Sequence, residues 1–166
     1  TCAVECKGAS LCERDNRSLA CRSFPFFPYF DSKSTLLGLT CYWEFEDRCW
    51  VISNLQVVEK QFVNEMIRAY EFLFEKDADQ LEAFIDESKR MRKVFSRRNE
   101  PIQLISRKME YLMILPKSKG RVIKTDALSF IPYKPFTSDK DYKKAIKEEG
   151  KDPKKYSLPK RPTTNF

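Results

Sequence analysis

Hydrophobic residues recur every three or four positions over residues 55–76, the longest regular pattern in the chain. This spacing places them on one face of an α-helix, because a helix completes a turn every ~3.6 residues. The stripe is broad, so the sequence predicts a helix at the centre of the core. Its members are Val58, Phe62, Met66, Ala69 and Leu73, flanked by Val63, Ile67, Tyr70 and Phe74.

A second helix is expected after a polar break at residues 77–79. Asp79 is followed three residues later by Glu82, which is the spacing of a capping box at a helix start. Apolar positions then continue at helical spacing through Leu81, Phe84 and Ile85. A single continuous helix across the break is the alternative.

A third helix is predicted between two prolines. Asn99 and Pro101 are typical of a helix start, and Pro116 would end the helix. The apolar positions between them, again three or four apart, are Ile105, Met109 and Leu112.

Residues 40–53 show a different, alternating pattern. Cys41, Trp43 and Phe45 fall on one side, and polar or half-polar residues fall on the other. Alternation with aromatic residues predicts β-strand, and a small hairpin would bring Cys41 opposite Cys49. A helix that starts after Asp47 is the alternative.

Residues 23–34 concentrate aromatic rings around two prolines. The rings are Phe24, Phe26, Phe27, Tyr29 and Phe30. Proline fixes φ and lacks an amide donor, so an extended, polyproline-like segment is expected here. We expect it to lie on the helix over 55–76 and to bury most rings, with Phe27 and Tyr29 left to contact a partner. Exposure of all five rings as a contact patch is the alternative.

The C-terminal part of the chain is basic and rich in proline. Residues 101–166 carry 16 Lys/Arg and 7 Asp/Glu, a net charge of +9, against +7 for the whole chain. A short helix capped by Ser138 is predicted over 138–150, and the rest of 132–166 is expected to be an extended arm. Because this arm cannot bury enough apolar area on itself, its order should come from the domain or from another chain.

Together these elements predict a mainly α fold. A domain of three or four helices over 55–131 would form the core, with a cysteine-rich segment over 1–54 packed on it and an extended basic arm over 132–166. The alternative is an α+β fold in which residues 111–131 form a second hairpin.

All the cysteines lie near the N-terminal end: Cys2, Cys6, Cys12, Cys21, Cys41 and Cys49. An even number confined to one end predicts a disulfide-stapled segment, and hence a secreted or lumenal protein in an oxidising compartment. A zinc site is the alternative, although the usual ligand spacing and any histidine are missing. The tripeptide from Asn16 to Ser18 is an N-glycosylation acceptor, in agreement with secretion.

Residues 88–99 are the strongest candidate for a binding surface. At about 100° per residue, five cations share one side of a helix, opposite an apolar side. These cations are Lys89, Arg90, Arg92, Lys93 and Arg97. Such a strip suits an acidic protein, a sulfated glycan or an anionic membrane surface. Nucleic acid is not expected, because no aromatic residue interleaves the strip. A solvated face that balances the preceding acidic run is the alternative.

Little in the composition points to catalysis. The chain has no histidine, and its four glycines are scattered outside any phosphate-binding motif. Carboxylates do lie four residues apart, at Glu71 and Glu75 and at Glu82 and Asp86, but solvated helices commonly show such pairs. We therefore expect a non-enzymatic protein without a cofactor, a metal or a transmembrane segment.

Three functions are compatible with this sequence. The favoured one is a secreted or lumenal interaction protein that binds an acidic protein or a sulfated glycan. The second is an accessory subunit of a larger complex, held by its C-terminal arm. The third is a carrier of a small molecule or lipid, with a cavity lined by the Phe-rich segments.

Overall fold

The fold is α+β, so the prediction of a mainly α protein is wrong and its α+β alternative is confirmed. The computed structural model describes residues 12–45, 49, 51–52, 55–126, 139–148 and 150. Five antiparallel strands form one sheet in the order β1-β2-β3-β4-β5. They are β1 (Phe26–Phe30), β2 (Leu36–Cys41), β3 (Ile102–Ile105), β4 (Tyr111–Ile114) and β5 (Val122–Thr125). The helices are α1 (Leu19–Ser23), α2 (Lys60–Lys76), α3 (Ala78–Arg98) and α4 (Asp139–Glu148).

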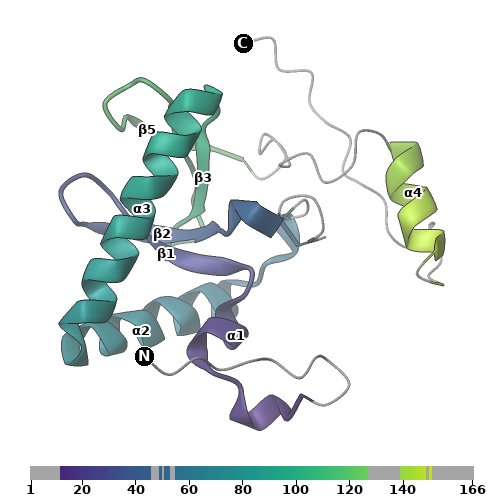
Figure 1. Cartoon of the computed structure of the whole chain (residues 1–166), viewed down its shortest axis with the longest axis horizontal. Coiled ribbons are helices and arrows are strands. Elements are labelled where there is room, and N and C mark those ends of the chain that lie inside the picture. The colour runs from purple at the N-terminus through teal and green to yellow at the C-terminus, as the bar shows by residue number, and fades with distance from the viewer. Residues whose placement is uncertain are drawn as a thin grey trace.

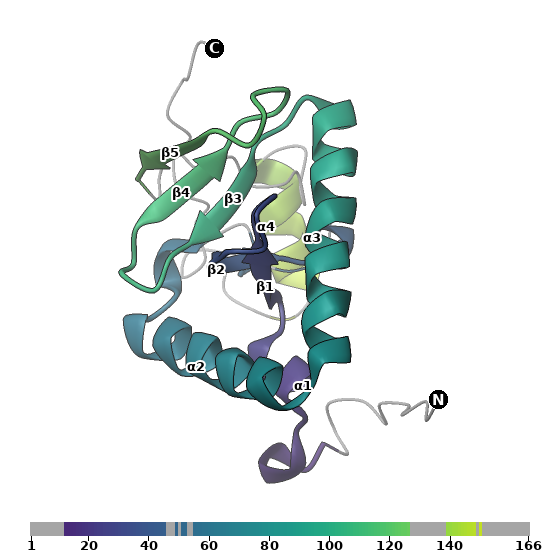
Figure 2. The same cartoon turned by 90° about the vertical axis from the view of Figure 1, so that its left-hand side faces the viewer.

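Two local hairpin units, far apart in the chain, make up this sheet. β1 pairs with β2, and β3, β4 and β5 follow one another as a meander. The units meet at β2 and β3, where Leu39 pairs with Ile105 and the Thr40 hydroxyl donates to the carbonyl of Gln103 at 2.8 Å. The connection between them carries α2 and α3, which pack against the sheet (Figure 1). In Figure 2, α2 crosses beneath the sheet and α3 rises along one side of it.

The aromatic segment forms β1 rather than a polyproline-like strap. All five of its residues are buried, because helices cover the strand where it is not paired with β2. Phe26 lies 5.7 Å from Phe62 of α2, and Phe30 lies 5.5 Å from Phe74, measured between ring centroids. Pro28 is tolerated because β1 is an edge strand, where a missing amide donor breaks no ladder. Burial on α2 was thus expected correctly, whereas the backbone conformation was not.

Serine hydroxyls on the helices satisfy buried polar groups next to β1. The backbone N–H of Phe30 donates to Ser88 Oγ at 3.0 Å, and the Ser88 hydroxyl donates to the carbonyl of Phe84 at 2.8 Å. On the other side, Ser23 Oγ lies 2.7 Å from the Tyr70 hydroxyl. Because an unpaired buried donor is costly, Ser88 stabilises the edge of the sheet as well as its own helix.

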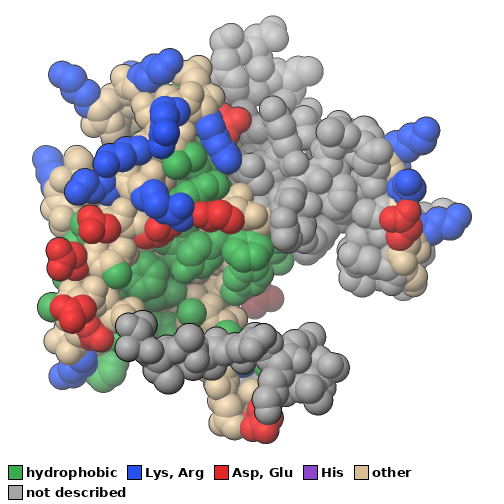
Figure 3. Space-filling view, viewed as in Figure 1, with side chains coloured by type: hydrophobic (Ala, Val, Ile, Leu, Met, Phe, Trp, Pro, Cys, Tyr) green, Lys and Arg blue, Asp and Glu red, His purple; other side chains and the backbone are tan. Residues whose placement is uncertain are grey.

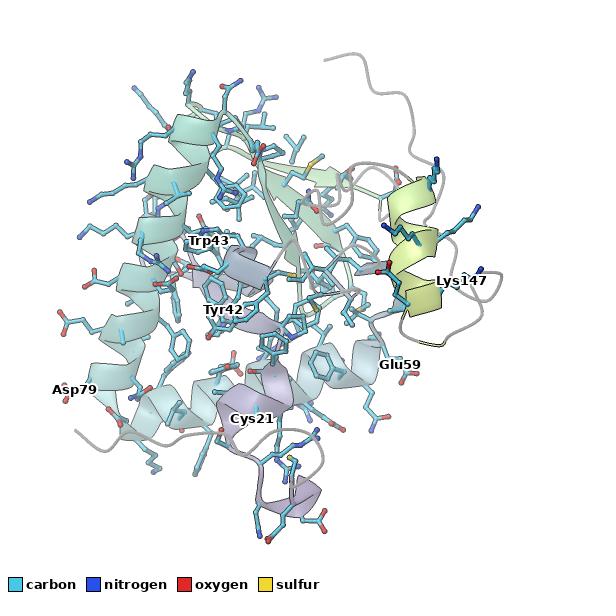
Figure 4. The ribbon with its side chains drawn as sticks, turned by 45° about the vertical axis from the view of Figure 1, so that its right-hand side comes forward. Cys21, Tyr42, Trp43, Glu59, Asp79 and Lys147 are labelled. Atoms are coloured by element: carbon cyan, nitrogen blue, oxygen red, sulfur yellow. The ribbon has the colours of Figure 1, made fainter. Side chains whose placement is uncertain are left out.

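The two long helices are separate, as expected, but the second begins earlier than its sequence pattern suggests. Asp77 is the N-cap, and its Oδ1 accepts from the backbone N–H of Gln80 at 3.0 Å. Asp79 lies inside the first turn and points into solvent (Figure 4). The cap is therefore shifted by two residues, because either aspartate can supply the oxygen that a helix start requires.

The predicted third helix is a β-hairpin instead. α3 ends at Arg98, its C-cap Asn99 adopts a left-handed conformation with φ of 57°, and β3 follows Pro101 directly. β3 is buried at every position, so its pattern does not alternate as that of a half-exposed strand would. Ile105, Met109 and Leu112 are three or four residues apart, as on a helix, but they lie in β3, in the turn that follows it and in β4.

The hairpin expected over residues 40–53 is also absent from the described part of this segment. β2 ends at Cys41, and a 3-10 turn follows at Trp43–Phe45. Every described cysteine is a free thiol, so the prediction of a disulfide-stapled segment is wrong for them. They are Cys12, Cys21, Cys41 and Cys49. Cys2 and Cys6 lie outside the described residues.

Gly38 allows the two hairpin units to approach each other. A Cβ atom at this position would lie 2.3 Å from the carbonyl oxygen of Ile105, far inside van der Waals contact. Only glycine therefore fits on β2 opposite the end of β3.

The helix predicted near the C-terminal end is confirmed as α4, although Ser138 and most of the basic arm lie outside the described residues. Within the part that the structure describes, no helix has the length and apolar character needed to cross a membrane.

Candidate anion-binding cleft

A cleft of about 1020 Å³ lies where three separate segments meet. Its walls are the β1–β2 turn, the last turns of α3 and the β4–β5 loop, which lie on the side of the molecule turned to the viewer in Figure 2. The ends of β3 and β4 form its base. Residues from both hairpin units are therefore required to form it.

Positive charge dominates the lining of this cleft. Its cations are Lys33, Arg92, Lys93, Arg97, Lys117 and Lys119. Two carboxylates, Asp31 and Glu100, also line it, and both are engaged locally: Asp31 with backbone amides and Glu100 with Arg98 at 3.9 Å. None of the six cations forms an ion pair with any described carboxylate. In Figure 3, Lys and Arg side chains gather at this end of the molecule.

The β1–β2 turn holds Lys33 at the rim. Asp31 Oδ1 accepts from the backbone N–H groups of Lys33 and Thr35, each at 2.8 Å. The N–H of Asp31 donates to the carbonyl of Thr35 at 3.0 Å, and Ser34 takes a positive φ of 60°. The carboxylate thus fixes the turn, which presents the Lys33 side chain to solvent.

α3 supplies three cations from its C-terminal half. The Arg92 guanidinium donates to the carbonyl of Phe30 and, at 3.3 Å, to the hydroxyl of Tyr29, so it is held against β1. Arg97 Nε donates to the carbonyl of Lys93 at 3.3 Å. Burial raises the pKa of Tyr29, although the hydrogen bond from Arg92 opposes that rise. Tyr29 therefore remains a neutral phenol beside the cations at neutral pH.

The β4–β5 loop brings two more lysines to the opposite wall. Ser118 braces this loop: its hydroxyl donates to the carbonyl of Leu115 at 2.6 Å and accepts from the N–H of Arg121 at 3.1 Å. Lys117 and Lys119, on either side of it, adopt left-handed conformations with φ of 54° and 56°. Residues with a Cβ rarely do so, because the conformation costs about 1–2 kcal/mol per residue.

Beneath the cations the cleft is apolar. Its deeper lining consists of buried side chains, among them Phe95, Ile102 and Ile114. Nearer the surface it is lined by Leu115 and Pro116, which are half-buried, and by Val122, which is 42% exposed. The site thus combines an apolar base with a cationic rim.

The structure divides the cationic strip that was predicted on residues 88–99. Arg92, Lys93 and Arg97 line the cleft, but Lys89 and Arg90 do not. Lys89 Nζ pairs with Asp86 Oδ1 at 3.7 Å. Sequence periodicity could not find Lys33, Lys117 or Lys119, because they come from turns distant in the chain. The sequence indicates only that each of these lysines lies among turn-forming residues.

Arg90 has a structural contact of its own. It forms ion pairs with Glu44 at 2.6 Å and Glu87 at 2.7 Å, and its guanidinium lies 4.5 Å from the centre of the Trp43 ring. These acceptors raise the pKa of the guanidinium further, mainly through Glu87. Trp43 lies beside α3 in Figure 4, so Arg90 fastens the 3-10 turn to the helix.

The aromatic residues expected to meet a partner lie elsewhere than predicted. Phe27 and Tyr29 are each 0% exposed, so neither ring is offered at the surface. The exposed ring of this segment is Phe24, at 45%, which contacts Phe45 edge to face with centroids 5.0 Å apart.

The carboxylate pairs on the helices form no cluster that suggests chemistry. Glu71 forms an ion pair with Arg107, and Asp86 forms the one with Lys89 already described. Among the described residues, no group of three His, Cys, Asp or Glu side chains is placed to hold a metal ion.

The expectation of secretion loses the support that it drew from disulfides, because the described cysteines are free. The expectation of glycosylation rested on the tripeptide and on its agreement with secretion. Asn16 lies exposed in a 3-10 turn, where its side-chain amide donates to Glu13 at 2.6 Å. Nothing beyond the tripeptide itself supports a glycan on Asn16.

Neither the protein-family models, nor the curated proteins, nor the solved structures contain a match to this chain.

Proposed function

We propose that this protein is a non-enzymatic binding protein that holds an anionic ligand in the cleft. One observation carries the proposal: six cations from three separate segments converge there without a carboxylate partner in the described structure. Bringing like charges together is unfavourable in the free protein, and an anionic ligand would relieve that repulsion.

The expected attraction is substantial although each contribution is small. A single charge pair in a water-like environment is worth about 1 kcal/mol at 4 Å, and about half of that at 8 Å. Several cations around one ligand therefore supply a few kcal/mol, enough for specific but salt-sensitive binding. The lining also provides hydroxyl and apolar groups, which are suited to recognition.

Lysine variants in two matched sets test this proposal. The first set replaces Lys33, Lys117 and Lys119 of the cleft with glutamine. The control set replaces Lys89, Lys124 and Lys144, each of which is ion-paired with a neighbouring carboxylate. Both sets remove the same charge, so any effect of net charge alone is equal in the two proteins.

The measurement is binding to polyglutamate and to heparin at several salt concentrations. We expect the cleft variant to lose at least tenfold in affinity and the control to lose much less. Both should keep their unfolding temperature, because exposed charges contribute only about 0–1 kcal/mol. Equal losses in the two variants would mean that the cleft is not the binding site.

A further inference from the structure

We propose that the ligand of the cleft is an acidic peptide segment that carries one large apolar side chain between its carboxylates. This inference rests on the proposed function and specifies the chemical class of its ligand. Two features of the lining support it: its apolar part and the two carboxylates among the cations.

The exposed apolar part of the lining calls for an apolar group on the ligand. Val122, the first residue of β5, leaves 42% of its surface exposed, and it lines the cleft together with Leu115 and Pro116 of the β4–β5 loop that carries Lys117 and Lys119. Removing apolar surface from water is favourable, and this term would strengthen binding. A ligand made only of charged groups could not cover these apolar side chains and would gain nothing from them. One leucine- or phenylalanine-sized side chain would cover it.

The carboxylates of the lining disfavour a uniformly charged polyanion. Asp31 lies at the base of the β1–β2 turn and Glu100 follows the end of α3, so negative charge lies on two sides of the cleft. A sulfated glycan carries charge on nearly every sugar and would place some of it against these oxygens. A peptide can place an uncharged residue at those positions and its carboxylates at the lysines.

A lipid fits the lining less well than a peptide. The deep apolar residues Phe95 and Ile102 are 1% and 2% exposed, so they offer little surface to a long acyl chain. The accessible apolar residues Leu115, Pro116 and Val122 lie within a few positions of Lys117 and Lys119 in the chain, which matches a single side chain on a polar backbone. The lining therefore favours a peptide over a sulfated glycan and over a membrane lipid.

Two short, glutamate-rich peptides of equal length and charge provide the test. One has a central phenylalanine and the other a central alanine, and fluorescence anisotropy measures the binding of each to the intact protein. We expect the phenylalanine peptide to bind roughly tenfold tighter, which is the scale of burying one large side chain. The replacement Val122→Ser should reduce this preference to roughly threefold.

Val57→Ser is the matched control, because Val57 is 47% exposed and does not line the cleft. It should leave the preference for phenylalanine unchanged. Equal affinity of the two peptides, or the same effect from both valine variants, would overturn the inference. So would tighter binding of a heparin oligosaccharide of equal charge, or of phosphatidylserine vesicles.

The outcomes also separate this inference from the proposed function. If both peptides bind equally and the cleft lysine variant loses them, the cleft binds anions but has no apolar recognition. If neither peptide, heparin nor vesicles bind the wild-type protein, the proposed function fails and the inference fails with it.

Discussion

Replacing Lys117 and Lys119 with glycine should stabilise the protein and weaken anion binding at the same time. Both lysines hold left-handed backbone conformations, with φ of 54° and 56°. This costs about 1–2 kcal/mol per residue, and glycine avoids the cost. Glycine also makes the unfolded chain more flexible, and this entropy lowers the stability of the folded state by roughly 0.5–1 kcal/mol. The net stabilisation is therefore about 0.5–1 kcal/mol per site.

The pair of replacements should therefore add about 1–2 kcal/mol to the free energy of unfolding. For a chain of this size that corresponds to a rise of roughly 3–5 °C in the midpoint of thermal unfolding. Calorimetry measures the midpoint, and urea titration measures the free energy. Affinity for polyglutamate should fall by roughly five- to tenfold, because two cations leave the rim of the cleft.

Ser34→Gly separates conformational strain from charge. Ser34 also has a left-handed conformation, with φ of 60°, but it carries no charge and does not line the cleft. This variant should gain stability without losing affinity. If the lysine pair loses stability, or gains it while binding polyglutamate as tightly as the wild type, then the loop does not trade backbone strain for binding charge.

Three further predictions follow from buried groups. Ser88→Ala should lower the free energy of unfolding in urea by about 1–3 kcal/mol, because the N–H of Phe30 loses its acceptor; an unchanged value would mean that water replaces the hydroxyl. Burial raises the pKa of Tyr42 from 10.0 to about 12, so its contribution to stability is complete below pH 10 and is lost as the pH rises towards 12. Tyr42→Phe should flatten this alkaline decline, and an equally steep decline in the variant would contradict the assignment. Ellman's reagent should modify exposed Cys21 in the native protein but buried Cys41, whose pKa burial also raises, only on unfolding; a Cys21 that gives no thiol signal would contradict the free state.

The helices of this protein could be predicted from the sequence, because their burial is one-sided. α2 buries Val63, Ile67 and Tyr70, which recur at three- and four-residue spacing. α3 likewise buries Ser88, Met91 and Phe95. An amphipathic stripe of this kind survives in the sequence whatever the helix packs against.

The strands were harder to predict because most of them are buried on both faces. β1 and β3 show no exposed position, so neither has the alternation that identifies a strand. β1 also contains Pro28, which argues against a strand unless its place at the sheet edge is known. That place depends on pairing with β2 and on cover from α2 and α3, which is information that no local window contains.

The candidate site was predictable only in the part that one helix supplies. Arg92, Lys93 and Arg97 share a helical face, and a helical projection finds them. Lys33 and Lys119 come from turns that are far apart in the chain and meet only through the sheet. Turn chemistry marks those segments as loops but does not indicate which loops become neighbours.

The junction between β2 and β3 has a consequence for how the protein folds and responds to a ligand. Forming it closes a long stretch of chain that contains both major helices, and the entropy of that closure is recovered only when the two units dock. A ligand that contacts Lys33 on one unit and Lys117 on the other can bind only the docked form. At a hundredfold excess over its dissociation constant, such a ligand would add about 2.7 kcal/mol to the stability of the docked state. Occupancy of the cleft by such a ligand and completion of the sheet would therefore be linked equilibria, and amide exchange at the β2–β3 junction would report on both.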